Sequence, residues 1–485
     1  MKKAIVIGAG IGGLAASIRL QAKGYQVLVF ESNSYPGGKL TQIGNEQYRF
    51  DAGPSLFTMP EKVTELLNIK GSESPIFNYQ KLDEVCRYFY EDGTVVKGFA
   101  NGDLFAQEIK TKLGVSENVT KRYLTKSKFI FNAVNSLFLE KSLHKIKTYL
   151  SVKTFFSLIK LPFLNVGNTM NDINTKKLDN PKLVQLFNRY ATYNGSNPYE
   201  APGILNLIPH LEFGRGAFYP ENGMHSITKS LYQKANLLGV QFYFNSNVSN
   251  LNTKNSKVES IKVDGKKYEA DLFVSNMDVV PFYKKLLPNE KQPKRVIKQE
   301  RSSSALIFYW GIKKEFKELI LHNILFSNNY KDEFHYIFNK SDVYHDPTVY
   351  INISSKLSPA DAPMAKENWF VMINVPGDKG QNWDEIISTC KRNIITKINK
   401  NFNIDLEPLI EFEDVLDPRL IEKKTGSYQG SLYGTSSNQK KAAFFRHPNF
   451  SKELNNLYFC GGSVHPGGGI PLALSSAKIL SELVD

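Results

Sequence analysis

Residues 4–31, AIVIGAGIGGLAASIRLQAKGYQVLVFE, contain the local pattern that decides the fold. The apolar run 4–7 predicts a buried parallel strand, and residues 26–30 predict a second strand. Between them, residues 14–23 have the composition of a helix, which Gly24 ends. A strand, a glycine-rich turn, a helix and a second strand that ends in an acid form the arrangement that a bound dinucleotide requires.

The glycines of the turn each have a mechanical reason to be there. Gly8 permits a sharp turn, Gly10 lets the backbone approach a pyrophosphate, and Gly13 lets the helix pack closely on the strand. Gly12 completes the turn. The start of the helix offers unpaired amides to the phosphates. We therefore expect all four glycines at a dinucleotide cofactor.

Glu31 ends the second strand, 23 residues after Gly8. This spacing is typical of a carboxylate that accepts hydrogen bonds from the ribose hydroxyls of the adenosine half. A carboxylate there would repel the 2′-phosphate of NADP. The sequence therefore disfavours NADP as the cofactor.

Length and composition limit the classes of protein to which the chain can belong. Its 485 residues, 41% of them hydrophobic, suffice for two or three structural units with real cores, and 12% aromatic residues exclude wholesale disorder. The three cysteines are far apart and odd in number, which excludes a disulfide framework and a cysteine-built metal site. We expect a reducing compartment.

The formal net charge of +14 predicts an anionic partner, either nucleic acid or the surface of an acidic bilayer. No helix-turn-helix, zinc-finger spacing or RNP-like strand accompanies the basic residues, so we expect no nucleic acid. No run of about 20 apolar residues appears, so a membrane role would be peripheral.

Three further glycine-containing stretches extend the pattern to both ends of the chain. Residues 34–41 read SYPGGKLT, residues 50–55 read FDAGPS, and residues 457–472 read LYFCGGSVHPGGGIPL. With these motifs the sequence resembles the FAD-dependent amine oxidase superfamily, and within it the phytoene desaturase type of carotenoid desaturases and isomerases. The resemblance extends over nearly the whole chain.

The resemblance implies FAD as the cofactor. It places residues 37–39 along the flavin diphosphate and ribityl chain, the strand that leads to Val248 at the adenine, and the C-terminal motif beside the isoalloxazine. Glycines there allow close backbone approach, and a helix start stabilises negative charge on a reduced flavin. The expected cofactor-binding residues are Gly8, Gly10, Gly12, Gly13, Glu31, Gly37, Gly38, Lys39, Gly53, Pro54, Val248, Gly462, Ser463, Gly468, Gly469, Ile470 and Pro471.

We accordingly expect a mixed α/β protein with a Rossmann-like FAD-binding domain that is discontinuous in sequence. Its three parts would be residues 1–84, 201–281 and 421–485. Residues 282–420 would form a substrate domain of sheet plus helices, and residues 85–200 a helical region that associates with the membrane.

Residues 141–160 carry five lysines and no acid, interleaved with apolar side chains. That spacing is typical of an amphipathic helix on an anionic bilayer, although a solvated face over an ordinary core explains it too. The substrates of the family dissolve in lipid, which favours the membrane. We therefore expect a cytoplasmic protein that is peripheral to the inner face of the cell membrane.

The chemistry expected from the resemblance is desaturation of a carotenoid. The flavin removes hydride from a carbon next to the polyene, and the neighbouring carbon loses a proton. His465 and Asp51 are the candidate catalytic residues; Asp278 or water could also take the proton, and His465 could equally be a structural histidine bonded to the backbone. The electron acceptor stays open between oxygen and a quinone.

The C-terminal motif bears on the substrate. Residues 465–472 read HPGGGIPL, whereas phytoene desaturases are nearer HPGAGIPG. The difference resembles the branch of bacterial 1-hydroxycarotenoid 3,4-desaturases. A phytoene desaturase acting in several steps, a carotenoid isomerase, a flavin amine oxidase and a non-catalytic flavin- or carotenoid-binding protein remain alternatives.

Overall fold

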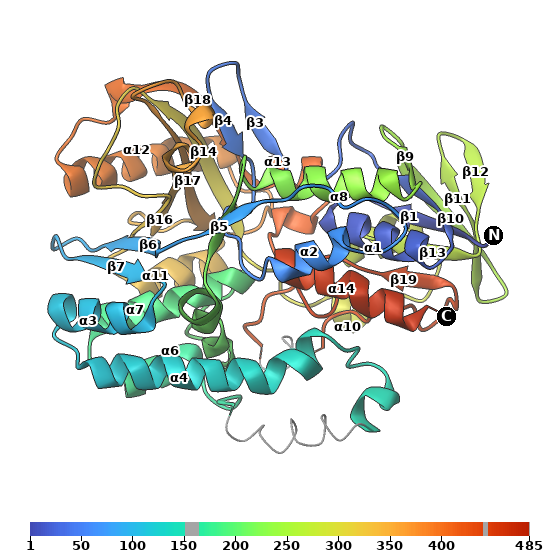
Figure 1. Cartoon of the computed structure of the whole chain (residues 1–485), viewed down its shortest axis with the longest axis horizontal. Coiled ribbons are helices and arrows are strands. Elements are labelled where there is room, and N and C mark those ends of the chain that lie inside the picture. The colour runs from blue at the N-terminus through green and yellow to red at the C-terminus, as the bar shows by residue number, and fades with distance from the viewer. Residues whose placement is uncertain (151–163, 440–444, 485) are drawn as a thin grey trace.

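The N-terminal pattern forms the centre of a five-stranded parallel sheet in the computed structural model, which describes residues 1–150, 164–439 and 445–484 (Figure 1). The strand order is β19-β13-β1-β2-β9, with Ile5 of β1 between Leu28 of β2 and Phe273 of β13. The central strand is therefore buried on both faces, as its apolar run predicted. The strands are β1 (Lys3–Ile7), β2 (Gln26–Phe30), β9 (Gln241–Tyr243), β13 (Leu272–Ser275) and β19 (Leu457–Phe459).

Helices cover one face of this sheet, and a small antiparallel sheet covers the other. On the helical face, a single hydrophobic cluster joins Val6 and Val29 of the strands to Leu14, Ile227 and Leu474 of three helices. On the opposite face, Ile5 and Phe273 pack with Ile261 of the small sheet. The helices are α1 (Ile11–Ala22), α2 (Glu61–Leu67), α8 (His225–Leu237) and α14 (Ile470–Leu483), and the small sheet has β10 (Val248–Lys254), β11 (Lys257–Val263) and β12 (Lys266–Glu269).

A second, seven-stranded sheet lies beside the first (Figure 1). Its order is β18-β14-β17-β16-β15-β6-β7, and only β15 and β6 pair in parallel among these neighbours. The strands are β6 (Glu84–Phe89), β7 (Val95–Phe99), β14 (Ser304–Ile312), β15 (His322–Leu325), β16 (Val349–Asn352), β17 (Glu367–Val375) and β18 (Ile410–Leu416).

The two faces of the second sheet have different partners because successive side chains of a strand point to opposite faces. In β14, Leu306, Phe308 and Trp310 pack in one core with the long helix α12 (Trp383–Phe402). The intervening Ile307 and Tyr309 face the other way. That second face is left to line the site.

A group of helices lies below the second sheet in Figure 1. Phe105, Ile130 and Leu183, from three of these helices, share one hydrophobic cluster with residues of the sheet. N-cap residues define the starts of two of these helices, since Asn101 and Asn180 each accept hydrogen bonds from the first backbone amides of their helix. The helices are α3 (Gly102–Leu113), α4 (Glu117–Val134), α6 (Met170–Lys177) and α7 (Pro181–Asn188).

The expected domain boundaries need correction at two points. Residues 84–99 are not part of a helical region, because β6 and β7 complete the seven-stranded sheet. β6 pairs with β15, which is more than 230 residues further along the chain, and β7 pairs with β6. Ile204, Leu205 and Phe213 pack with the helices below the second sheet, so the chain returns to the first sheet only near α8. Neither the strand pairing nor this hydrophobic packing leaves a signal in the local sequence.

The amphipathic helix expected over residues 141–160 is not continuous. Within the described part, a short 3-10 helix spans Ile146–Leu150, and residues 141–145 form turns. Residues 151–163 lie outside the described residues. No helix in the part of the chain that the structure describes is long and apolar enough to cross a membrane.

The core between α12 and the second sheet gives a test of the fold. Ile394 of α12 is fully buried in this core. We expect Ile394→Ala to lower the free energy of unfolding by about 2–4 kcal/mol, because the removed methylenes leave a cavity. Urea unfolding followed by circular dichroism measures the change. Thr396→Ala, at an exposed position of the same helix, should change it by less than about 0.5 kcal/mol. Equal effects of the two substitutions would contradict the assigned packing.

Candidate active site

A cavity of about 1460 Å³ opens between the two sheets. One part is lined by the glycine turn after β1 and by the start of α14, and another by the free face of the second sheet. Ligand pockets commonly hold about 300–1,000 Å³. This cavity therefore has room for a cofactor and a long substrate together.

The glycine turn leaves no space for side chains. A Cβ on Gly13 would lie 2.0 Å from the carbonyl oxygen of Gly8, and one on Gly12 would lie 2.5 Å from Asn276 Oδ1. Helix α1 begins there with Gly10 as its N-cap and no side chain capping it. The uncapped amides and the bare backbone fit a diphosphate, whose oxygens would accept from them.

Glu31 lines the same cavity and is almost fully buried. Its Oε1 accepts hydrogen bonds from Ser32 and Asn33, and its Oε2 accepts one from the amide of Ala9 at 2.7 Å. A carboxylate oxygen has two lone pairs. Oε2 can therefore accept a further bond from a ribose hydroxyl.

The segment 37–39 lies beside the glycine turn, since the amide of Gly37 donates to the carbonyl of Ala9 at 2.8 Å. Lys39 is partly buried, and its Nζ donates to the carbonyls of Ser431 at 2.9 Å and Leu432 at 2.8 Å. Burial lowers the pKa of this ammonium to about 8. Lys39 thus places a cation at the cavity and ties the loop at 431–432 to it.

The C-terminal motif supplies the opposite wall. Gly469, at φ 100°, precedes α14 without a capping side chain, and a Cβ on Gly468 would lie 2.7 Å from the Cα of Tyr433. A side chain at either position would therefore strain or displace the backbone. Of the cofactor residues expected from the sequence, the structure brings all but Gly13 to the cavity lining, and Gly13 packs against Gly8 instead.

Of the two candidate catalytic residues, His465 lines the cavity and Asp51 does not. Asp51 does not line the cavity; its carboxylate pairs with Arg49 and accepts from the amides of Met224 at 2.8 Å and His225 at 2.9 Å. This carboxylate therefore anchors the start of α8, which corrects the expectation of a catalytic role. The sequence could not reveal the two amide partners, because Met224 and His225 lie more than 170 residues away.

His465 does line the cavity, but its Nε2 lies 2.8 Å from the carbonyl oxygen of Lys141. A carbonyl only accepts, so this nitrogen carries a proton and donates it. Burial lowers the pKa of His465 to about 4, and the ring is neutral at pH 7. The geometry gives His465 the backbone-bonding role that the sequence had left open.

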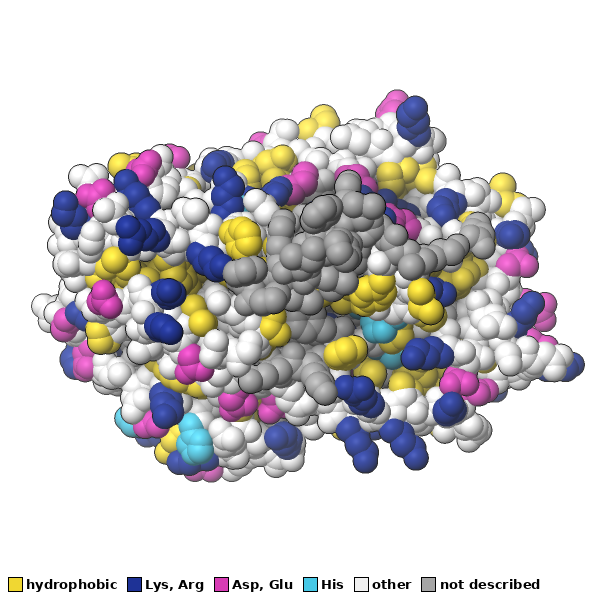
Figure 2. Space-filling model, turned by 90° about the horizontal axis from the view of Figure 1, so that it is seen from below, with side chains coloured by type: hydrophobic (Ala, Val, Ile, Leu, Met, Phe, Trp, Pro, Cys, Tyr) yellow, Lys and Arg dark blue, Asp and Glu magenta, His cyan; other side chains and the backbone are white. Residues whose placement is uncertain are grey.

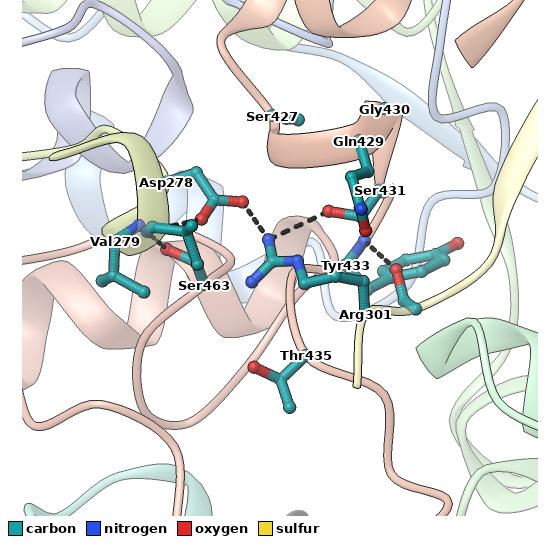
Figure 3. A network of polar contacts seen from close by, with 12 residues as sticks. Asp278, Val279, Arg301, Ser427, Gln429, Gly430, Ser431, Tyr433, Thr435 and Ser463 are labelled. Carbon is teal, nitrogen blue, oxygen red and sulfur yellow. Dashed lines mark hydrogen bonds and ion pairs between the residues drawn. The ribbon is translucent and has the colours of Figure 1, made fainter. Parts of the chain in front are cut away.

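Asp278, the other candidate acid, belongs to a network that sequence reasoning missed (Figure 3). One carboxylate oxygen accepts from the amide of Val280 at 3.0 Å, and the other pairs with Arg301. Arg301 also donates to Ser431 Oγ at 3.0 Å, and Ser463 Oγ accepts from the amide of Val279 at 3.1 Å. The network therefore connects the C-terminal motif to the loop after α13 (Pro418–Thr425).

Arg446 is a second cation that the sequence analysis missed, although it comes shortly before the C-terminal motif. It is buried and lines the cavity, and burial together with the charge of Arg301 lowers its pKa to about 10. Lys39 and Arg446 thus lie in the cavity lining, and Arg301 is paired with Asp278. The two positive charges of the lining suit an anionic group such as a diphosphate or a reduced flavin.

The part of the cavity away from the glycine motifs is mainly apolar. Leu139 and Leu143 contribute from the segment after α4, Ile204 and Leu207 from the helical region, and β14, β15 and β17 from the free sheet face. The second sheet contributes Ala305, Ile307, Tyr309, Ile324, Phe370 and Met372. A long hydrocarbon would bury its surface well here.

A buried polar cluster interrupts this apolar wall. Arg189 forms an ion pair with Glu212 at 3.3 Å and donates to Tyr88 Oη at 2.9 Å. Glu212 also accepts from Tyr190 at 2.5 Å and from Tyr193. Glu212 compensates the buried charge of Arg189, because burial of an unpaired guanidinium would cost much free energy.

Known proteins resemble this chain over its full length. The sequence pattern of the family described as flavin containing amine oxidoreductase matches residues 11–484. The chain is 55% identical to a 1-hydroxycarotenoid 3,4-desaturase of Flavobacterium sp. (strain P99-3), covering 100% of this chain and 99% of that protein. It is 31% identical to a 4,4′-diapolycopene oxygenase of Methylomonas sp., and the match covers 100% of this chain and 98% of that protein.

Solved structures show the same fold at low sequence identity. An oxidoreductase from Methanosarcina mazei superposes with a TM-score of 0.65 at 15% identity, covering 99% of this chain and 100% of that one. Wild-type putrescine oxidase bound to putrescine superposes with a TM-score of 0.65 at 12% identity, and the match covers 100% of this chain and 98% of that one.

The Glu31 assignment is open to a direct test. We expect Glu31→Gln to weaken FAD binding about 30-fold, which corresponds to about 2 kcal/mol, because a neutral amide is a poorer acceptor for a buried ribose hydroxyl. Titration of the flavin-free protein with FAD, followed by flavin fluorescence, measures the dissociation constant. The melting temperature of the flavin-free variant controls for damage to the turn. An unchanged dissociation constant would refute the assignment.

Proposed function

Because the chain belongs to the flavin-containing amine oxidoreductase family and has FAD as its cofactor, we propose that it desaturates a 1-hydroxylated acyclic carotenoid at the 3,4-position. The identity of 55% over the full length to a desaturase of that name carries the proposal. A cavity with a glycine-lined part and a mainly apolar part supports it, because cofactor and hydrocarbon can meet there.

Bound FAD supplies the acceptor for the hydride. The chain supplies position and surroundings. Apolar side chains such as Ile307, Ile324 and Met372 exclude bulk water and hold the polyene, while the uncapped starts of α1 and α14 and the cations in the lining favour anionic groups. The carbon beside a polyene cation is strongly acidic, so a weak acceptor such as water can take its proton. A dedicated carboxylate base is then unnecessary.

The charge of the substrate half favours a neutral hydrocarbon over an amine. A protonated amine would need a free anion, yet Glu212 is already shared by Arg189 and two tyrosines. Burying an unpaired charge among the apolar residues would be costly. The observed lining therefore disfavours an amine oxidase. The carotenoid that is converted, and the mass of its product, distinguish the proposed activity from a multi-step phytoene desaturase and a carotenoid isomerase.

Expression in bacterial hosts that accumulate different carotenoids tests the reaction. In a host that accumulates a 1-hydroxylated carotenoid, we expect a red shift of the pigment spectrum and a product two hydrogens lighter by mass spectrometry. Phytoene should stay colourless. Colour formed from phytoene would make the chain a multi-step desaturase, and an isomer of unchanged mass would make it an isomerase.

We further propose that the enzyme collects its substrate from the inner face of the cell membrane. Ile146 is 81% exposed and Tyr149 is 44% exposed, although both are large and apolar. Figure 2 shows the face below α4, where hydrophobic side chains and clusters of Lys and Arg flank the grey residues. The same stretch lines the cavity through Leu139 and Leu143. An exposed apolar patch flanked by cations suits an anionic bilayer.

Vesicle flotation tests the membrane surface. We expect Ile146→Ser to weaken binding to vesicles that contain anionic lipid by about 10-fold, because burial of this side chain in the bilayer is lost. Met364→Ser, which removes an apolar side chain that is 94% exposed on another part of the surface, is the matched control and should bind normally. Equal binding of both variants would refute this surface, and the flavin spectrum would verify that the site is intact.

A further inference from the structure

His322 has a buried ring nitrogen with no partner among the residues that the structure describes. The residue lies on β15, is 2% exposed and lines the cavity beside Ile324. Its Nε2 makes no hydrogen bond in the structure. Buried polar atoms nearly always have partners, so an unpaired one at a ligand cavity calls for an explanation.

The neighbours of the ring determine where its proton is. The side-chain nitrogen of Asn352 donates to the carbonyl of Leu321 at 3.1 Å, which fixes the orientation of that amide, since a carbonyl cannot donate. The same nitrogen lies 3.2 Å from His322 Nδ1. An amide nitrogen only donates, and Nδ1 must therefore accept.

The ring is also neutral. Burial and the nearby charge of Arg189 lower the pKa of His322 to about 3. A neutral imidazole whose Nδ1 accepts carries its proton on Nε2. The unpartnered atom is therefore an N–H donor on a residue that lines the substrate cavity.

The surroundings limit what this donor can bind. The walls next to it are apolar, through Ile324 and Phe370, and the charge of Arg189 is compensated by Glu212. A protonated amine has no lone pair to offer, and a carboxylate would be left without a free cation. A neutral oxygen on a hydrocarbon, as in an alcohol, satisfies the donor without burying a charge.

His322 is also connected to the cofactor side of the cavity. Its Nδ1 lies 2.7 Å from Tyr350 Oη, which in turn lies 2.8 Å from Ser55 Oγ. Ser55 follows Gly53 and Pro54, which line the cavity next to the Lys39 segment. The donor is thus held by a short chain of hydrogen bonds from the cofactor-binding part.

We propose that the Nε2–H of His322 donates a hydrogen bond to the hydroxyl oxygen on C1 of the substrate and so sets which carbons face the flavin. This inference rests on the proposed function. A polyene offers nearly the same apolar surface at each repeat, and apolar walls alone let it slide. Only two bonds separate C1 from C3, so an anchor on the C1 hydroxyl fixes the position of C3 and C4.

Two matched substitutions separate the donor from the rest of the ring. Gln places its side-chain nitrogen where Nε2 of histidine lies, so His322→Gln keeps a donor toward the substrate. Asn places an acceptor where Nδ1 lies but is too short to reach the Nε2 position, so His322→Asn keeps the contact with Asn352 and loses the donor. Ile324→Val, a small apolar change on the same wall, is the control.

The experiment compares purified holoenzymes on a 1-hydroxylated carotenoid and on the same skeleton without the hydroxyl. We expect the ratio of kcat/KM values, hydroxylated over unhydroxylated, to fall at least about 10-fold in His322→Asn, as for the loss of one buried hydrogen bond. The ratio should stay within about 3-fold of wild type in His322→Gln and Ile324→Val. The products of His322→Asn should include double bonds at other positions.

The possible results are distinguishable. An unchanged ratio in His322→Asn with a normal flavin spectrum would overturn the role of His322 while leaving the proposed function in place. A wild-type enzyme that does not convert the hydroxylated carotenoid would overturn both. If His322→Asn does not retain FAD, a second measurement decides. Quenching of protein fluorescence then gives the equilibrium binding of the two carotenoids to wild type and to His322→Gln. Loss of the preference for the hydroxylated carotenoid in His322→Gln overturns the inference, and retention of that preference supports it.

Discussion

The site depends on one close contact, the packing of helix α1 against strand β1 at Gly13. No Cβ fits there, because the carbonyl of Gly8 would lie 2.0 Å away. This contact brings the start of the helix to the end of the strand, where its free amides face the cavity. Asn276, just past the end of β13, and Gly461, just past the end of β19, approach the same turn. Three strand ends from distant parts of the chain thus converge on one point.

The second sheet completes the site through the alternation of its side chains. One face of β14 is occupied by the core with α12, so the opposite face is free to line the cavity. The same alternation on β15 brings His322 and Ile324 to the cavity and sends Leu325 to the core. A rigid sheet, rather than a flexible loop, therefore holds both the apolar wall and the ring of His322.

Charge inside the molecule is distributed in two ways. In the substrate half, Arg189 and Glu212 compensate one another, which leaves a neutral environment suited to a hydrocarbon. In the cofactor half, Asp278 pairs with Arg301, and Lys39 and Arg446 add two cations to the lining. Positive charge there suits a diphosphate or a reduced flavin. One cavity thus provides two electrostatic environments.

The sequence by itself determined the elements whose signals are local. The strands and helix of residues 4–31, the acid at Glu31 and the glycine motifs at both ends follow from short patterns, because backbone conformation and close packing restrict which residues can occupy them. For the same reason nearly all the predicted cofactor residues line the cavity.

Only the tertiary structure decided the roles that depend on distant partners. Asp51 is structural because its carboxylate meets the amides of Met224 and His225, and His465 because it meets the carbonyl of Lys141. The boundary at residue 84 was misplaced because β6 pairs with β15. The free donor of His322 exists only because Asn352 lies against the other ring nitrogen. A hydrogen bond between residues far apart in the chain leaves no periodicity, so packing alone creates it.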